Sequence, residues 1–328
     1  MKYIFIFLII LIALIYTFNN KIFVWYLRRD KGDGIDKSPK NIEEVRNRII
    51  IKLDRRYDSI FKQNNYDAYI PKTNNKVPVI VWFHGGSFIA GDKIGIKNFG
   101  TLMADKGYAF FSVNYEWAPE KHFPSQLEQL NDFFKYLNSE LKNELSIDTS
   151  KIILGGDSAG ANIIASYVAA CRNEQLSKEL KFKSIINEEI KGMLLFCGPL
   201  DFRYNPNIIK NKKLKFFMKQ IGWAYLGKKF WWKTRLPILS SPIAWVNKDY
   251  PPTYIVDGNK FSFEDQGKAM LRELESKGVF AKGRFYKDKE IPHEFQFNYK
   301  KYNIEAMEVF EESIEFLKEV MKDNEKSY

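Results

Sequence analysis

The segment 155–162 reads GGDSAGAN and places Ser158 between Gly156 and Gly160, directly after the apolar run 152–154. An apolar run that ends in glycines is typical of a buried strand turning sharply into a helix. The G-x-S-x-G spacing fits a bend at which small residues let strand and helix approach closely while one hydroxyl stays accessible. The pentapeptide is short, so its neighbours decide between a nucleophile and an ordinary strand-to-helix turn.

Apolar strands alternate with amphipathic helices along most of the chain. After a helix and an extended stretch in 41–66, we expect strands at 77–86, 108–116, 151–158, 192–201, 252–258 and 283–288, and helices at 96–107, 124–143, 159–172, 263–278 and 304–322. This alternation predicts an α/β fold with a mostly parallel central sheet flanked by helices. Ligands of such sheets bind at the carboxyl ends of the strands, where Ser158 falls.

Residues 203–247 interrupt the alternation. They are rich in lysine and aromatic residues, and the next acidic residue is Asp249. We expect a helical lid insertion over the strand ends. It would form a wall of the binding pocket or touch a membrane surface, and a packed helical cover with a solvated lysine face is an equally good interpretation.

The first 27 residues differ from the body of the chain, 28–328. Residues 3–18 are apolar without interruption, and an aromatic and then basic stretch follows at 22–29. This pattern favours an uncleaved membrane anchor, with a cleaved signal segment and secretion as the alternative. The basic residues that flank the segment give conflicting cues, so the sequence does not predict an orientation.

Composition narrows the function classes. The 328 residues are 45% hydrophobic and 28% charged, which is typical of a globular protein. The net charge of +11 permits a nucleic-acid partner, but helix-turn-helix and zinc-finger spacings are missing from the sequence. Cys171 and Cys197 are expected to be free thiols. We therefore expect no nucleic acid, no metal and no cofactor.

A second motif, HGGSF at 84–88, follows the first long strand. Adjacent glycines can direct bare N–H groups at a developing oxyanion, and losing one such donor typically costs about 3–4 kcal/mol. We expect Gly85 and Gly86 to be donors, together with the N–H of Ala159 after the serine. The alternative is a Gly-Gly turn without a chemical role.

A general base is available after the last strand. The chain has three histidines, of which His84 lies in the glycine loop and His122 precedes a long helix. His293, in IPHEFQF, stands where the base of a serine hydrolase follows its nucleophile and acid in chain order. We expect His293 to activate Ser158.

Together, HGGSF, NYEWAPE, IDTSKIILGGDSAGAN, PPTYIVDG and IPHEF resemble the hormone-sensitive-lipase-like branch of the α/β-hydrolases, which includes bacterial acetyl esterases and arylacetamide deacetylases. The resemblance covers about residues 77–320. It implies an α/β-hydrolase fold and cofactor-free hydrolysis of carboxylic esters. It also implies that Ser158 is the nucleophile, that His293 is the base, and that Gly85, Gly86 and Ala159 form the oxyanion hole.

One position departs from the family pattern. Phe261 stands where the family has its catalytic aspartate. Glu264, one turn into the next helix, can reach back toward the helix start and is our predicted acid. Asp257 at the strand end is the rival, and Asp265 reads as a first-turn residue that complements the helix dipole.

These residues predict a serine carboxylic-ester hydrolase, an esterase or deacetylase, that acts on small-molecule esters with small or medium acyl groups. The catalytic set would be Ser158, His293 and Glu264. The alternative, motivated by Phe261, is a membrane-tethered hydrolase-fold binding domain with weak or no activity.

Overall fold

The protein is represented by a computed structural model that describes residues 20–29 and 37–323. The described residues form one eight-stranded sheet with the strand order β1-β2-β4-β3-β5-β6-β7-β8. The strands are β1 (Ile49–Arg56), β2 (Asn65–Pro71), β3 (Val77–Phe83), β4 (Ala109–Val113), β5 (Ile147–Asp157), β6 (Ile190–Phe196), β7 (Thr253–Asp257) and β8 (Ala281–Phe285). β2 pairs antiparallel with β1 and with β4, and the pairs from β4 to β8 are parallel.

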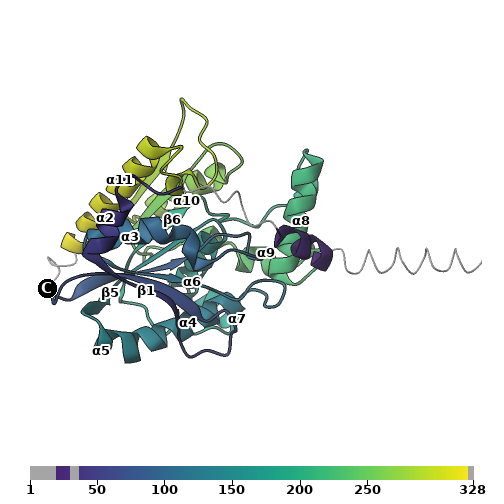
Figure 1. The fold of residues 1–328 in the computed structure, drawn as a ribbon. Helices are drawn as coiled ribbons and strands as arrows, with labels where there is room; N and C mark the ends of the chain where they lie inside the picture. Colours follow the sequence, from purple (N-terminus) through teal and green to yellow (C-terminus); the bar gives the residue numbers. More distant parts are fainter. Residues whose placement is uncertain (1–19, 30–36, 324–328) are drawn as a thin grey trace, which may run out of the picture.

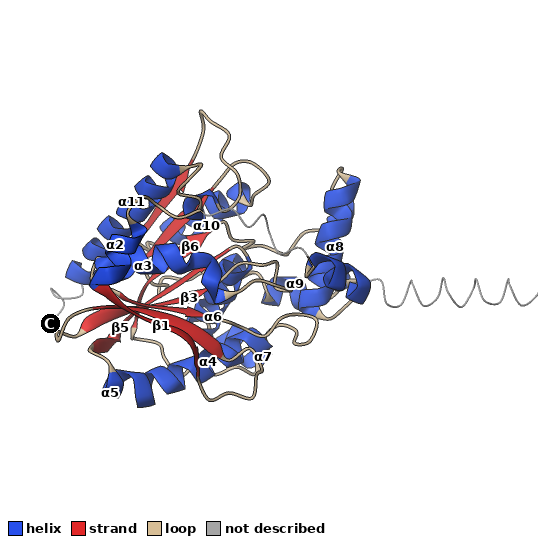
Figure 2. Cartoon of the chain, in the orientation of Figure 1, coloured by secondary structure: helices blue, strands red, loops and turns tan. Residues whose placement is uncertain are grey.

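Helices cover the sheet on both sides (Figure 1, Figure 2). The helices of the body are α2 (Ile42–Arg48), α3 (Lys97–Asp105), α4 (Ser125–Tyr136), α5 (Lys142–Glu144), α6 (Ala159–Arg172), α7 (Glu174–Leu180), α10 (Glu264–Ser276) and α11 (Asn303–Asp323). Short 3-10 helices lie at Lys93–Ile96 and Phe295–Phe297, and a π-helical turn at Leu137–Leu141. The prediction of an α/β fold with a mostly parallel sheet is confirmed.

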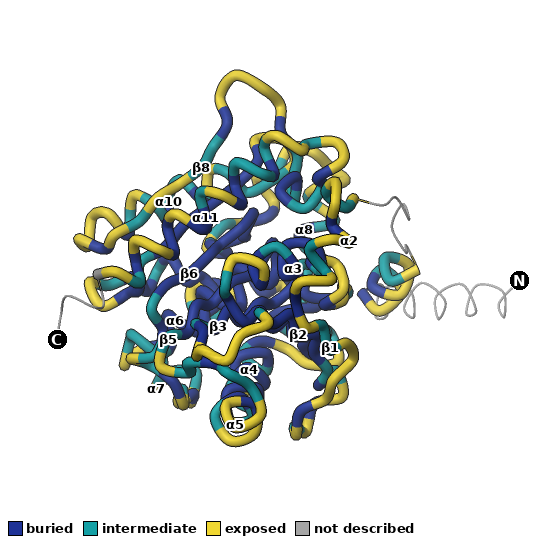
Figure 3. The backbone as a smooth tube through the Cα atoms, turned by 60° about the vertical axis from the view of Figure 1, so that its left-hand side comes forward, coloured by how far each residue is buried: buried dark blue, intermediate teal, exposed yellow. Residues whose placement is uncertain are grey.

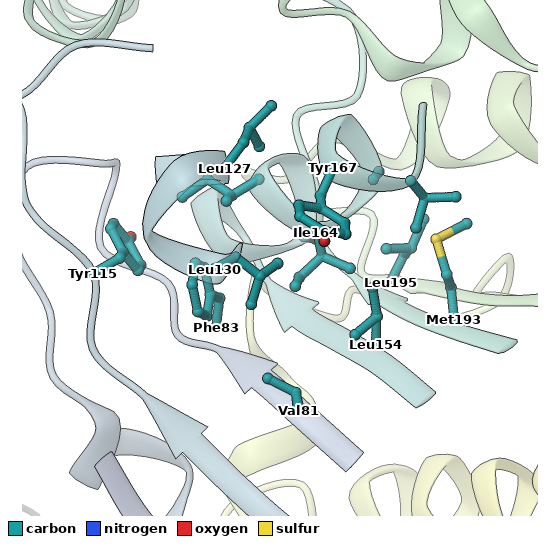
Figure 4. Packing of buried hydrophobic residues seen from close by; sticks show 14 of the residues in the cluster. Val81, Phe83, Tyr115, Leu127, Leu130, Leu154, Ile164, Tyr167, Met193 and Leu195 are labelled. Atoms are coloured by element: carbon teal, nitrogen blue, oxygen red, sulfur yellow. The ribbon is translucent and has the colours of Figure 1, made fainter. Parts of the chain in front are cut away.

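The core consists of two apolar layers, one on each face of the sheet. Successive side chains of a strand point to opposite faces, so in β3 Val81 joins one layer and Trp82 the other. Helices α4, α6 and α10 contribute to the first layer, part of which is shown in Figure 4, and α3 and α11 contribute to the second. Burial on both faces explains why the central strands read as continuous apolar runs (Figure 3).

The expected insertion lies between β6 and β7. It contains the helices α8 (Lys212–Leu226) and α9 (Leu236–Leu239) and 3-10 turns at Pro206–Ile208, Trp231–Lys233 and Pro242–Trp245. The buried amide of Asn162 in α6 donates to the carbonyls of Pro199 and Ser240, at 2.8 and 3.1 Å, and accepts from the hydroxyl of Tyr225 in α8. The helix that follows Ser158 is thus bonded to the segment just before the insertion and to two points within it. Its movement as a lid stays a prediction.

The predicted membrane segment falls mostly on residues 1–19, which lie outside the described residues. Residues 20–27 are helical and lie beside α8 (Figure 1). Within 20–29 and 37–323, no helix is both long enough and apolar enough to cross a membrane. The boundary at 27/28 and the domain assignment remain predictions.

Candidate active site

Ser158 sits at a strained bend between β5 and α6. Its backbone has φ 49° and ψ −118°, and its N–H donates to the carbonyl of Phe196 at 2.8 Å. Such a conformation is costly for a non-glycine residue and persists only where the surroundings impose it. Here it directs the serine side chain away from the strand, with the N-terminus of α6 immediately behind it.

The glycines on either side of Ser158 permit this bend by close packing. A Cβ on Gly160 would lie 1.9 Å from the carbonyl oxygen of Phe83 in β3, and one on Gly156 would lie 2.5 Å from the carbonyl carbon of Gly160. Real Cβ atoms do not approach that closely. The G-x-S-x-G spacing is therefore required by the contact of α6 with β3 and β5.

The structure brings His293 to Ser158. The imidazole Nε2 lies 3.0 Å from the serine Oγ, and Nδ1 lies 2.7 Å from the hydroxyl of Ser262. Burial lowers the pKa of His293 to about 4, so the ring is neutral at pH 7. A ring that carries its proton on Nδ1 accepts at Nε2, which is the state that a general base for Ser158 needs.

Two carboxyl groups lie near the imidazole. Glu294 Oε1 is 3.8 Å from Nε2, on the side of Ser158, whereas Asp257 is linked to the Nδ1 side through Ser262. Asp257 is buried at the end of β7 and accepts a hydrogen bond from the same Ser262 hydroxyl that contacts His293. Burial raises the pKa of Asp257 to about 7, although the bond from Ser262 acts in the opposite direction. The structure therefore aligns Asp257, Ser262, His293 and Ser158 in one chain of hydrogen bonds, in which Ser262 connects the acid to the base.

Glu264, the predicted acid, is not part of this chain. It lies in the first turn of α10, where its carboxylate pairs with Lys268 one turn later, at 2.7 Å. Phe261, at the family's aspartate position, has φ +52° and is 91% exposed. The loop thus turns the side chain of Phe261 outward. The contacts do not bring Glu264, the predicted acid, to His293, whereas those of its rival, Asp257, reach the imidazole through Ser262, and the choice of acid stays a prediction. The motif analysis missed Ser262, whose only signal in the sequence is its place next to Phe261.

The glycine loop divides its N–H groups between two directions. The N–H of Gly85 donates to Asp157 Oδ2 at 2.7 Å, so it is not directed at the pocket as expected. Gly86 has φ +127°, and a Cβ there would collide with the carbonyl of Ala90 at 2.0 Å. Ser87 follows with φ +54° and lines the same cavity as Ser158 and Ala159. The remaining candidates for oxyanion donors are Gly86 and Ala159 from the prediction, with Ser87 in place of Gly85.

A pair of carboxyl groups, the buried Asp157 and the partly exposed Glu294, lies against this loop. Asp157 accepts from the indole Nε1 of Trp82 at 2.7 Å as well as from Gly85, and it shares a hydrogen bond with Glu294. Burial and the neighbouring Glu294 raise the pKa of Asp157 well above its usual value, and burial raises that of Glu294. The hydrogen bond between these two carboxyl groups links the residue before Ser158 to the residue after His293.

A cavity of about 630 Å³ opens beside Ser158 and His293. Its lining is mainly apolar and comes from the glycine loop, from α8 and from the loop between β7 and α10. The apolar residues include Phe88, Phe202, Phe217, Met218, Ile221 and Phe263. Its volume is in the range of small-molecule sites. The cavity can take an apolar group whose reacting carbon lies at the serine hydroxyl.

The other histidines have structural contacts. His84 is buried, with Nδ1 2.6 Å from the carbonyl oxygen of Gly85 and its ring stacked on Tyr115. His122 Nδ1 lies 2.8 Å from the carbonyl oxygen of Ala224 in α8, which fixes the start of the α4 segment against the insertion. Neither ring contacts Ser158, as expected from their positions in the sequence.

One group of side chains has the composition of a metal site. Among the described residues, ligand atoms of Cys197, Asp257 and His293 lie within 4.8 Å of one another. Burial raises the pKa of the Cys197 thiol well above its usual value, which opposes the thiolate that a metal would need. Both nitrogens of His293 are already engaged with serine hydroxyls, so these contacts would compete with a metal for the ring.

The fold and the arrangement of Ser158 and His293 define an α/β-hydrolase. The family model described as BD-FAE matches residues 66–265, and the chain belongs to this family. The predicted resemblance to hormone-sensitive-lipase-like α/β-hydrolases is confirmed, since the relatives include carboxylesterases and an arylacetamide deacetylase.

The chain is similar to an alpha/beta hydrolase of Acanthamoeba polyphaga mimivirus, with 26% identity over 230 residues, or 67% of this chain and 63% of the relative. Arylacetamide deacetylase of Oryctolagus cuniculus is 30% identical over 126 residues, or 36% of this chain and 32% of the relative. The matches thus span less than two thirds of these relatives. Esterase B of Lactobacillus rhamnosis superposes with a TM-score of 0.71 at 17% identity, covering 97% of this chain and 96% of the neighbour, which shows a shared fold.

Proposed function

We propose that this protein is a serine carboxylic-ester hydrolase that acts on small or medium acyl esters. The observation that carries the proposal is the 3.0 Å approach of His293 Nε2 to Ser158 Oγ at a strained bend. A serine hydroxyl is a weak nucleophile by itself and needs an adjacent base. The esterases among its relatives and structural neighbours support the reaction class.

The reaction would proceed in two acyl-transfer steps. Ser158 Oγ attacks the ester carbonyl while His293 Nε2 takes the hydroxyl proton, and the N–H groups of Gly86, Ser87 and Ala159 hold the oxyanion. The tetrahedral intermediate then expels the alcohol, which receives the proton from His293. Water attacks the acyl-serine with the same base, and the acid and free Ser158 are released.

Asp257 would stabilise the imidazolium through Ser262. When His293 gains a proton, its Nδ1–H donates to the Ser262 hydroxyl, whose own proton points to the Asp257 carboxylate. This arrangement supplies an acid although Phe261 occupies the usual position. It removes the motive for the inactive binding-domain alternative, because that alternative depended on the lack of an acid.

The pocket supports the proposed acyl range. Its lining near Ser158 is mainly apolar, and its 630 Å³ exceeds what an acetyl group fills. An acyl chain of several carbons would lie against Phe217, Met218 and Ile221 of α8. We expect a preference for butyrate over acetate among p-nitrophenyl esters, since each buried methylene contributes about 0.8 kcal/mol.

The test is hydrolysis of p-nitrophenyl acetate, butyrate and octanoate by wild type and by Ser158→Ala. Wild type should turn over at least one ester and react with a fluorophosphonate probe, and the variant should do neither. The structural Ser166, buried in α6 away from the cavity, offers a matched control in Ser166→Ala, which should keep both properties. A folded wild type that shows no turnover and no labelling would refute the proposal.

Attachment to a membrane through residues 1–27 is part of this proposal. Its support is the apolar sequence of residues 3–18. Membrane fractionation with a carbonate wash would test it, since an anchored chain stays with the lipid. Recovery of the uncleaved chain in the wash would contradict it, and recovery of a shortened chain would favour a cleaved signal.

A further inference from the structure

The insertion and residues 20–29 expose apolar side chains on neighbouring surfaces. Phe23 packs edge-on against Phe216 and Phe217 of α8, with ring centroids 5.5 and 6.0 Å apart. The buried amide of Asn20 donates to the carbonyl and side-chain oxygens of Gln220 in the same helix, at 2.8 and 2.9 Å. These contacts hold the 20–29 helix along α8, as Figure 1 shows.

Several large apolar side chains in and around this contact remain open to solvent. Phe216 and Leu214 of α8 are 50% and 49% exposed, and Ile208 just before the helix is 73% exposed. From the 20–29 helix, Ile22, Trp25 and Tyr26 are also more than half exposed. An exposed group of large apolar side chains of this kind marks an interaction surface. We call these six residues and the lysines described next the α8 face.

The lysines at the start of α8 are unfavourable for the helix itself. Lys212, Lys213 and Lys215 occupy its first turn, which holds no acidic residue, and Asn211 caps the free N–H groups. Cations at a helix N-terminus oppose the helix dipole and cost stability. From Phe202 to Lys248 the sequence has no aspartate or glutamate that would compensate them. Their placement is explained if they serve a negatively charged partner.

We infer that the α8 face docks on an anionic phospholipid bilayer. Lysines at the start of a helix that exposes aromatic and aliphatic side chains match a surface that is negatively charged at its headgroups and apolar beneath them. The sequence adds a second reason, because the apolar residues 3–18 directly precede the helix that forms part of this face. Leu214 belongs both to the face and to the lining of the cavity beside Ser158, so docking would bring the cavity close to lipid.

The experiment compares binding of the full chain to vesicles of pure phosphatidylcholine and of phosphatidylcholine with 30% phosphatidylserine. The apolar residues 3–18 would bind both, so the difference between the two reports on the α8 face. We expect at least tenfold tighter binding to the anionic vesicles, lost in 0.5 M NaCl. The triple variant Lys212→Glu, Lys213→Glu, Lys215→Glu should lose this preference. Each basic residue near an anionic membrane surface raises the binding affinity by about tenfold or less.

Two controls keep the outcome decisive. The glutamates of the triple variant favour the helix dipole, so circular dichroism should show an intact fold whether or not the protein turns over esters. A matched variant, Lys76→Glu, Lys181→Glu, Lys183→Glu, changes the same charge at exposed positions away from α8 and should keep the preference. Phe216→Ser should weaken binding to both vesicles.

Equal binding to the two vesicles, or a preference that the α8 variant retains or the matched variant also loses, would overturn the inference. Sedimentation velocity without lipid addresses another occupant, a second copy of the chain. A dimer that the triple variant dissociates, with vesicle binding unchanged, would assign the face to self-association and also overturn it. None of these outcomes depends on ester hydrolysis.

Discussion

Two loops at the carboxyl end of the sheet each turn a non-glycine residue into positive φ, with opposite consequences. At the end of β5, Ser158 has φ 49° and is buried among glycines that allow no Cβ. After β7, Phe261 has φ 52° and projects into solvent, while Asp257 and Ser262 on either side of it reach inward.

The difference shows how strictly each part of the site is determined. The backbone at Ser158, the proposed nucleophile, has only one arrangement, because α6, β3 and β5 meet at backbone distance around it. The proposed acid could stand at several positions, because a carboxyl group can reach the imidazole from different points of a looser loop or through another hydroxyl. A side chain at the usual acid position is therefore replaceable, whereas the glycines around Ser158 are not.

The largest effect on activity is expected from Asp257→Asn. An amide cannot stabilise the imidazolium, and in other triads this change lowers kcat by about 10⁴-fold. Glu264→Gln is the matched control and should stay within about twofold, because Glu264 pairs with Lys268 rather than with His293. Initial rates with p-nitrophenyl butyrate measure both. If Glu264→Gln lost its hydrolytic activity and Asp257→Asn kept the wild-type rate, the acid would be assigned to Glu264 instead.

Gly160→Ala should be the most damaging change at the other loop. Its Cβ would meet the Phe83 carbonyl at 1.9 Å, so backbone must move, and we expect a loss of about 3 kcal/mol or more in the free energy of unfolding. At Gly95 a Cβ would meet nothing within 4 Å, so Gly95→Ala should change the free energy of unfolding by under about 0.5 kcal/mol. Urea unfolding followed by tryptophan fluorescence compares the two, and equal midpoints would contradict the packing argument.

A smaller effect is expected from Ser262→Ala, which removes the link between acid and base. Losing a hydrogen bond to a charged group costs about 1.5–3 kcal/mol, so kcat should fall about 10- to 100-fold with little change in KM. Ser262→Thr retains the hydroxyl and should recover most of the rate. If the alanine and threonine variants are equally impaired, the hydroxyl does not position His293 and the effect is one of packing.

The smallest effect is a pH dependence with opposite signs for activity and stability. Catalysis needs ionised Asp257, so kcat/KM should rise through pH 7 and be about tenfold lower at pH 6 than on its plateau, while His293 stays neutral above pH 4. The pKa of Asp257 in the folded state is above its unfolded value, so its protonated form stabilises the fold at low pH. That contribution is lost as pH rises from about 4 to about 7.

The pH profile of kcat/KM and of the thermal midpoint should therefore differ between wild type and Asp257→Asn. The variant cannot titrate at this position, so its stability should fall less between pH 5 and pH 8. Two results would show that Asp257 is already ionised over the whole range from pH 5 to pH 8. One is a kcat/KM of wild type that rises near pH 4 instead of pH 7, and the other is a thermal midpoint that depends on pH identically in wild type and variant.

Much of this molecule follows from its sequence. Short apolar runs such as 77–83 and 152–154, the latter followed by glycines, favoured strands buried on both faces, and the amphipathic periods between such runs favoured covering helices. The G-x-S-x-G spacing placed Ser158 at a tight turn because local packing leaves no other option. His293 could be predicted as the general base because the chain has few histidines and this one follows the last strand.

Tertiary structure alone decided the remaining parts of the site. Asp257 and Glu264 are seven positions apart, and only the course of the loop between β7 and α10 turns Asp257 and Ser262 toward His293. The N–H of Gly85, in the loop after β3, donates to Asp157 at the end of β5, and no local pattern reveals a contact between residues so distant in sequence. Local spacing thus determined the strands, the helices and the tight turn at Ser158, whereas hydrogen bonds across loops depend on directions that only the packed fold sets.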